Sequence, residues 1–166
     1  NLDGSPYSLS DHHPFQQLFN CDMPQKLTLK TGRQVSKSTF MASHGVVLSN
    51  AIGPPAFPHF TTLYITPLYE QIRRFSNNYV RPFVLQSPVR SLWTGTETEQ
   101  SVLQLSFKNH SKMIFSFALQ DADRIRGIKA DKMSIDEVQD MDPAHLPIIR
   151  EVMSYSPWSI EQTTGT

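Results

Sequence analysis

The sequence predicts an α/β protein with a mainly parallel central sheet flanked by helices, and three observations lead to this fold class. Strand-like apolar runs alternate with amphipathic helical runs along the 166 residues. A Lys-Ser pair, Lys37–Ser38, lies where a strand-like run passes into a helical run. An Asp-Glu pair, Asp136–Glu137, closes a short apolar run about a hundred residues later. Recurrence of strand, loop and helix is typical of a parallel sheet with helices on both faces.

The first third of the chain predicts a short helical segment, then a strand, a polar loop and a longer helix. Residues 1–12 are polar and rich in turn formers, which predicts an irregular lead-in, and residues 15–19 (FQQLF) predict one or two helical turns after a proline. Polar and apolar residues alternate over 26–30, which predicts a short strand. Apolar residues with helical spacing predict a helix over 38–50, and prolines and a glycine predict a loop over 52–59.

The middle of the chain predicts a second strand over 60–66, ended by Pro67. Apolar residues three and four apart predict an amphipathic helix over 68–80. Two strand-like runs, 101–107 and 113–119, are joined by a turn-like segment and predict a strand pair.

The last third repeats the alternation of strand and helix. Residues 131–135 predict a short strand that leads into Asp136, and residues 143–154 predict a helix with one apolar side. Residues 158–164 predict the final strand.

Composition excludes several classes of protein. Lys plus Arg and Asp plus Glu are 15 each, so the net charge of zero argues against a large basic surface that binds nucleic acid unaided. The lone Cys21 excludes an intramolecular disulfide framework and fits a reducing compartment. No apolar run approaches the roughly 18 residues of a membrane span. The chain opens on Asn1 and stops within a strand-like segment, so we expect an excised domain.

The segment TGRQVSKST, residues 31–39, predicts a phosphate-binding loop. A full loop has the pattern GxxxxGK[ST]; here Thr31 and Ser36 occupy the two glycine positions and Gly32 comes one place late. The backbone amides and Lys37 would hold phosphates, and the hydroxyl of Ser38 would ligate magnesium. A side chain at position 36 is expected to cost roughly 1–3 kcal/mol if its backbone adopts a sparsely populated conformation. By spacing alone, a basic polar turn remains the alternative.

The Asp136–Glu137 pair supplies the carboxylates that a magnesium-nucleotide hydrolase needs. Asp136 would support the metal, and Glu137 would orient and polarise the attacking water. Neighbouring strand residues point to opposite sides, so we expect one carboxylate to face the metal and the other the water. An acidic turn after a strand is the alternative.

Several segments together resemble phage large terminases, the ATPases that package viral DNA. GRQVSKST resembles their RQxGKST loop, and FTTLYITPLYEQIRRF resembles the strand and helix that follow it. IRGIKADKMSIDEVQDM resembles their Arg-Gly segment and second nucleotide motif, and EQTTGT resembles the start of their coupling motif. The resemblance extends from about Pro14 to Thr166. It implies an ASCE, RecA-like P-loop NTPase fold, with residues 1–166 as the ATPase domain, residues 1–25 as its adenine-side lead-in, and the nuclease domain absent from this chain.

The resemblance also implies a role for each matching residue. Gln16 would recognise adenine, with Gln17 as a near-equal candidate, and Arg33 would stabilise phosphate charge. Arg126 would be offered to the ATP of a neighbouring subunit, with Arg124 as the alternative. Thr163 and Thr164 would couple hydrolysis to movement, because their strand is expected beside the strand that leads to Glu137. The implied nucleotide-binding set is Gln16, Thr31, Gly32, Arg33, Gln34, Val35, Ser36, Lys37, Ser38 and Thr39.

The implied activity is Mg²⁺-dependent ATP hydrolysis that drives double-stranded DNA into a procapsid. The implied partners are the portal ring, the small terminase subunit and further copies of the chain in a ring, with no membrane. The implied location is the host cytoplasm, docked on the procapsid. We expect the isolated domain to be a weakly active monomer that does not cleave DNA.

Two alternatives stay open from the sequence. DEVQD also resembles the DExQ box of helicases, although the arginine within the loop and the TTGT segment favour a terminase. Ser36 supports a degenerate P-loop module that binds nucleotide or a partner without turnover. The six histidines show no pairing at metal-ligand spacing.

Overall fold

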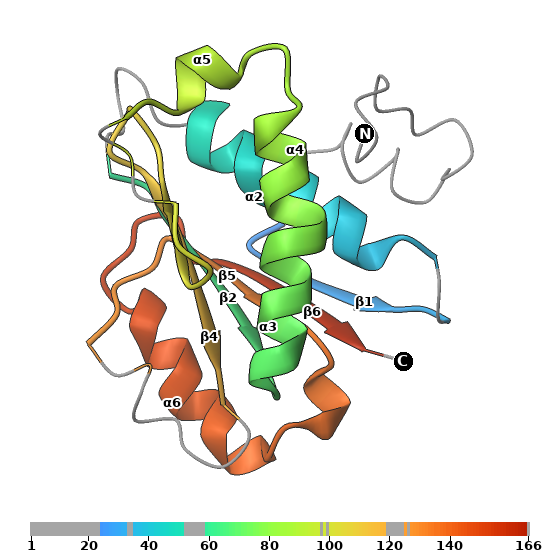
Figure 1. Cartoon of the computed structure of the whole chain (residues 1–166). Coiled ribbons are helices and arrows are strands. Elements are labelled where there is room, and N and C mark those ends of the chain that lie inside the picture. The colour runs from blue at the N-terminus through green and yellow to red at the C-terminus, as the bar shows by residue number, and fades with distance from the viewer. Residues whose placement is uncertain are drawn as a thin grey trace.

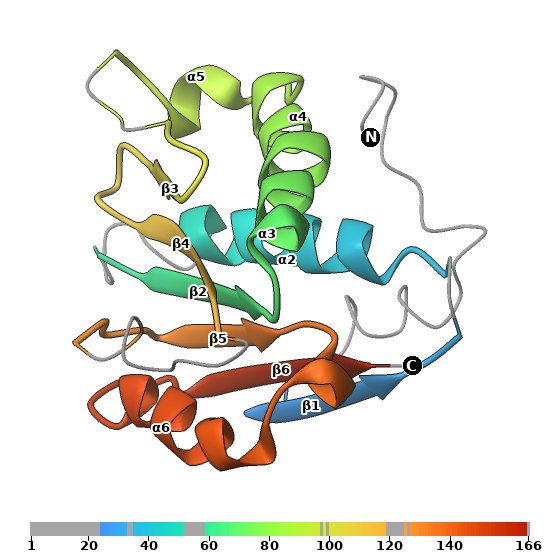
Figure 2. The ribbon, with the colours of Figure 1, turned by 60° about the horizontal axis from the view of Figure 1, so that its bottom comes forward.

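The computed structural model describes residues 24–32, 35–51, 59–96, 98, 100–118, 125 and 127–165. These residues form a six-stranded sheet with the strand order β1-β6-β5-β2-β4-β3 (Figures 1 and 2). All neighbouring strands are parallel except β3 and β4, which are antiparallel. The strands are β1 (Lys26–Lys30), β2 (Thr61–Thr66), β3 (Gln104–Ser106), β4 (Lys112–Phe117), β5 (Lys132–Ile135) and β6 (Ile160–Gly165). The mixed α/β fold class with a mainly parallel sheet is therefore confirmed.

Helices cover both faces of this sheet. On one face lie α2 (Lys37–Ala51), α3 (Tyr69–Phe75), the π-helical turn η1 (Ser76–Val80) and α4 (Arg81–Leu85), whereas α6 (Leu146–Arg150) lies on the other face (Figure 2). Short segments complete the described helices: α5 (Arg90–Trp93), η3 (Val138–Asp140), η4 (Pro143–His145) and η5 (Glu151–Met153). Among these helices, none has the length and apolar character needed to cross a bilayer.

Strand β2 separates two hydrophobic cores. Tyr64 points to the core beneath α2 and α3, which includes Phe40 and Phe75. Leu63 and Ile65 alternate with Tyr64 and point to the core beneath α6. All six residues of β2 are buried because both faces of the strand are covered.

The strand order brings three strand ends together. Strand β6 lies between β1, which leads to the phosphate loop, and β5, which leads to the acidic pair. Thr164 is in register with Leu29 of β1, and Thr163 with Ile135 of β5. Because the three strands are parallel, their carboxyl ends meet at one edge of the sheet, where ligands bind in open α/β folds.

The structure differs from the expected elements mainly in its helices. The helix expected over 68–80 continues to Leu85 through the π-helical turn, which lies just before Pro82. Proline cannot donate the backbone hydrogen bond of a regular helix, so a wider turn at this point is a natural accommodation. The helix expected over 143–154 is a succession of 3₁₀, α and 3₁₀ turns. The predictions for residues 1–12, 15–19 and 52–58 lie outside the described residues.

Candidate nucleotide site

The segment predicted to bind phosphate lies in the sequence between β1 and the N-terminus of α2. Ser36, the residue before the helix, has a φ of 65°, which is the left-handed region that favours glycine. Its carbonyl accepts the backbone hydrogen bond of Phe40 (3.0 Å) and so closes the first helical turn. The backbone here has the conformation that a glycine would adopt without strain, and the strain expected from Ser36 is present in the structure.

The loop is tied to the end of β6 through one carbonyl group. The ammonium group of Lys37 donates a hydrogen bond to the carbonyl oxygen of Gly165 (3.0 Å), and the backbone N–H of Thr31 donates a longer one to the same oxygen (3.4 Å). The segment predicted to bind phosphate is therefore in direct contact with the end of β6.

A polar cleft of about 150 Å³ lies where α2, β2, α3 and the segment after β5 converge. Its lining combines Ser38 with Asp136 and Glu137, the three residues that the sequence assigns to magnesium and water. The cleft is smaller than the roughly 300–1,000 Å³ of typical ligand pockets, so it suits phosphate groups and a hydrated metal ion rather than a whole nucleotide. The remaining lining residues are Tyr64, Thr66, Gln71, Arg74, Phe75 and Tyr79.

Asp136 is buried and fixed by three hydrogen bonds. The hydroxyl of Tyr64 donates to Oδ2 (2.8 Å), while the hydroxyl of Thr164 and the backbone N–H of Glu137 (3.1 Å) donate to Oδ1. Burial, followed by the negative charge of Asp136, raises the pKa of Tyr64 well above its ordinary value of 10.0, so this phenol stays a donor. These contacts use three of about four lone-pair positions of the carboxylate, which leaves room for one further partner.

Glu137 does not continue the strand. Strand β5 ends at Ile135, and Glu137 has left-handed dihedral angles (φ 54°, ψ 43°). The expected alternation of the two carboxylates across a strand is therefore wrong. A reversal of the backbone places both of them along the same cleft, and one oxygen of Glu137 accepts a hydrogen bond from the side chain of Gln139 (2.6 Å).

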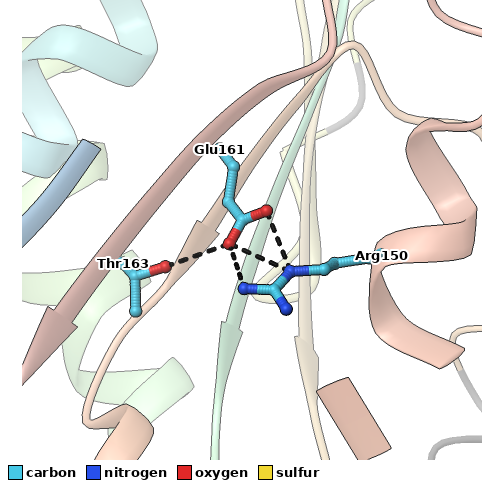
Figure 3. Close-up of polar contacts among 3 residues, drawn as sticks. All are labelled: Arg150, Glu161 and Thr163. Atoms are coloured by element: carbon cyan, nitrogen blue, oxygen red, sulfur yellow. Dashed lines mark hydrogen bonds and ion pairs between the residues drawn. The ribbon is translucent and has the colours of Figure 1, made fainter. Parts of the chain in front are cut away.

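The two threonines of the coupling segment have different surroundings because they point to opposite faces of β6. Thr164 contacts Asp136, whereas Thr163 lies beside Glu161, with a long hydroxyl contact of 3.4 Å. Glu161 in turn forms a bidentate ion pair with Arg150 of α6, in which Nη2 of Arg150 lies 2.7 Å from Oε1 of Glu161 (Figure 3). The expectation that this strand lies beside β5 is confirmed, but only Thr164 contacts the acidic pair.

Several of the predicted site residues cannot be placed. Gln16, Arg33, Gln34 and Arg126 lie outside the described residues, and so do the alternatives Gln17 and Arg124. By contrast, Tyr64, Gln71 and Arg74 line the cleft without having been predicted from the sequence. The only signal for them was their position in the strand and helix that follow the loop, which does not distinguish a cleft-lining side chain from a core or surface one.

Two larger hollows lie elsewhere. Cavities of about 430 and 460 Å³ share Gly127, Ile128 and Lys129, which precede β5 and so lie at the opposite edge of the sheet. Neither is lined by the acidic pair or by a residue of the phosphate loop. Chemistry, rather than volume, identifies the smaller cleft as the candidate site.

Comparison with solved structures places this geometry in a known fold. The large terminase ATPase domain of Thermus phage P74-26 superposes with a TM-score of 0.73 at 16% identity, covering 98% of this chain and 65% of that one. The fold is that of phage large-terminase ATPase domains. The HK97 bacteriophage large terminase has a TM-score of 0.65 at 14% identity, covering 86% of this chain and 29% of that one.

The large terminase of a thermophilic bacteriophage, in complex with ATP-γ-S, has a TM-score of 0.61 at 15% identity, covering 96% of this chain and 38% of that one. The chain thus spans slightly less than two thirds of the Thermus phage domain and a smaller part of the other two proteins. Neither a family model nor a curated protein matches the sequence. The solved structures therefore confirm the terminase ATPase fold that the sequence motifs predicted.

Proposed function

We propose that the chain is the ATPase domain of a viral DNA-packaging motor, a terminase large subunit that hydrolyses Mg-ATP to move double-stranded DNA into a procapsid. The observation that carries this proposal is the convergence of Ser38, Asp136 and Glu137 in one polar cleft beneath the loop at Ser36. The terminase-like fold supports the same function.

The donors in the cleft suit magnesium. A hydroxyl and a carboxylate are hard oxygen ligands, and Mg²⁺ is usually held by one or two such groups together with substrate phosphates and waters. No group of three His, Cys, Asp or Glu side chains that could hold a metal by themselves occurs in the described part of the chain. Ser38 would bind the ion directly. Asp136, already holding three hydrogen bonds, would act through a metal-bound water.

The other residues of the site divide the work of hydrolysis. Lys37 and the loop amides hold the phosphates, and the N-terminus of α2 favours their negative charge. Glu137 orients a water for direct, in-line attack on the terminal phosphate. We further propose that Gln16 contacts adenine, Arg33 neutralises phosphate charge, and Arg126 completes the site of a neighbouring subunit in a ring.

The same reasoning extends to the proposed partners. A motor of this kind works with double-stranded DNA, a portal ring and a small terminase subunit, docked on a procapsid in the host cytoplasm. The net charge of zero fits a domain that binds DNA as part of such an assembly rather than alone.

Two substitutions test the proposed activity. Glu137→Gln should leave the affinity for Mg-ATP intact and reduce single-turnover hydrolysis at least about 100-fold, because it removes the water-orienting carboxylate only. Lys37→Ala should instead weaken binding, measured by calorimetry with a non-hydrolysable analogue. Near-normal turnover in Glu137→Gln would contradict the assignment of the catalytic carboxylate.

A second candidate function is a degenerate P-loop module that binds nucleotide without turnover, and the left-handed Ser36 is the observation that favours it. Tight binding of Mg-ATP by the wild-type chain, with no hydrolysis that Glu137→Gln can abolish, would support this module over the ATPase.

A further inference from the structure

Gln139 contacts the proposed catalytic carboxylate directly. Its side-chain N–H donates to Oε2 of Glu137 at 2.6 Å, a short hydrogen bond to a charged acceptor. A second contact of the same nitrogen, to Asp140, is long (3.4 Å) and therefore weak. Within the described residues, Oε1 of Glu137 accepts no hydrogen bond from the protein. One oxygen of the carboxylate is thus held by Gln139.

The other end of the same carboxamide lies close to the end of β6. A Cβ atom built on Gly165, the last residue of β6, would lie 2.8 Å from Oε1 of Gln139 and 3.5 Å from Cγ1 of Val138. The first distance is too short for a real contact, whereas the second is ordinary. Since Gly165 does not have a left-handed φ and the near atom is the end of a flexible side chain, a methyl group at this position would move Gln139 rather than strain the backbone.

Gly165 also contacts the phosphate loop, because its carbonyl accepts the hydrogen bond from Lys37. Two hydrogen bonds, Lys37 to Gly165 and Gln139 to Glu137, therefore lie on either side of the place where Gln139 comes close to Gly165.

We propose that Gln139 is a positioning residue that orients Glu137 and reports the position of the β6 end to it. This inference rests on the proposed ATPase function. The backbone of Glu137 is fixed in a left-handed turn, so the direction of its carboxylate depends on side-chain contacts such as this one. A displacement of Gly165 toward the carboxamide moves Gln139 and thereby releases the carboxylate.

The experiment is a double-mutant cycle on the full chain with Gln139→Ala, Gly165→Ala and the combination. Each single variant should lower the steady-state kcat about tenfold, equivalent to about 1.4 kcal/mol, with KM for Mg-ATP unchanged. In the Gly165 variant the new methyl group displaces the flexible end of Gln139, which is its only severe contact. Once residue 139 is alanine, the second change should add nothing. Gln86→Ala truncates an exposed glutamine that is distant in sequence from Gln139, so it is the control and should keep full activity.

Three outcomes would overturn the proposal. Fully additive losses would mean that residues 139 and 165 act independently, and unchanged kcat in both single variants would mean that the contact does not orient Glu137. A change in KM or binding alone would also count against a positioning role.

A second readout does not depend on activity. The side-chain amide resonances of Gln139 in ¹⁵N NMR spectra should shift in both Glu137→Gln and Gly165→Ala, and should shift much less in Asp140→Ala, whose contact is long. If the wild-type chain neither binds nor hydrolyses Mg-ATP, the proposed function fails, and these shifts alone decide whether the contact exists. Resonances that do not move in Glu137→Gln and Gly165→Ala would refute the inference whatever the activity.

Discussion

Thr164 donates a hydrogen bond to Asp136, whereas the adjacent Thr163 faces the opposite side of β6 and the Arg150–Glu161 ion pair (Figure 3). Two neighbouring threonines of the same segment thus contact different parts of the protein. Of the two, only Thr164 forms a hydrogen bond to a carboxylate that lines the candidate cleft.

This difference predicts unequal effects of two isosteric substitutions. Thr164→Val removes a donor from a buried carboxylate, which should cost about 1–3 kcal/mol in stability and lower Mg²⁺-dependent ATP turnover about tenfold. Thr163→Val is the matched control and should change turnover less than about twofold, since its hydroxyl makes one long contact. Mg²⁺ titrations of ATPase rate would measure both, and equal losses would contradict the assignment of Thr164.

Tyr64 supports the same carboxylate from the other side. Tyr64→Phe keeps the ring stacked on Phe75, at 3.8 Å between centroids, but leaves Oδ2 of Asp136 without its donor. We expect a loss of about 1–3 kcal/mol in the free energy of unfolding, measured by urea denaturation. Tyr79→Phe, which removes a hydroxyl from the same cleft, should change the stability by less than about 0.5 kcal/mol. Similar losses of stability in both variants would mean that the hydrogen bond from Tyr64 to Asp136 contributes no more than any other hydroxyl in the cleft.

The sequence predicted the strands because their signals are local, and the two segments that it assigns to nucleotide follow β1 and β5 as expected. Alternating apolar residues define β1, and the Lys-Ser and Asp-Glu pairs lie at strand ends that the pattern already marks. It did not predict the hydroxyl of Tyr64 on Asp136, because the two residues are 72 positions apart and meet only when β2 and β5 pair. The sequence likewise did not predict that Gln139 and Gly165 come close together, because they too are distant in sequence. A backbone reversal at Glu137 was also missed, since a non-glycine residue gives no sequence signal for a left-handed turn.

A local sequence pattern also does not predict that the charged side chain of Lys132 is buried against His44. Lys132 occupies the first position of β5 and is fully buried, with its ammonium nitrogen 3.1 Å from Nδ1 of His44 in α2. Gln162 of β6 reaches the same ring nitrogen (2.9 Å). Burial lowers the pKa of Lys132 from 10.5 to about 7, and burial and then the charge of Lys132 lower the pKa of His44 from 6.5 to about 2.

These lowered pKa values predict that stability rises with pH. The unfolded chain binds protons that the folded chain binds more weakly, so the cost from Lys132 is complete below about pH 7 and disappears as pH rises toward 10.5. His44 adds a similar rise between about pH 2 and 6.5. Lys132→Met should raise the free energy of unfolding at pH 7 by about 1–4 kcal/mol and remove most of the rise above pH 7. Urea denaturation from about pH 6 to 9 would measure both effects, and Lys112→Met, at an exposed lysine, is the control. A less stable Lys132→Met protein would show that the His44 contact outweighs the cost of burying Lys132.

Ser36 gives the most direct test of the phosphate loop. Its φ of 65° is a conformation that glycine adopts without the steric cost of a Cβ atom. If the loop keeps this conformation around phosphate, the strain is equal in the free and bound forms, and Ser36→Gly stabilises the fold without changing affinity. If nucleotide binding tightens the left-handed turn, Ser36→Gly should strengthen binding of Mg-ATP up to about tenfold, for about 1.4 kcal/mol of relieved strain. We expect the second result, because the loop must close its amides around an anion.

Ser36→Ala separates strain from hydrogen bonding, because it keeps the Cβ atom and removes the hydroxyl. On the strain argument it should bind a non-hydrolysable Mg-ATP analogue as the wild-type chain does, while only the glycine variant binds more tightly. Weaker calorimetric binding by both variants would instead show that the Ser36 hydroxyl donates to a phosphate oxygen and that the serine is a ligand. That outcome would remove the argument for a degenerate loop, since the residue in the glycine position would then contribute to nucleotide binding.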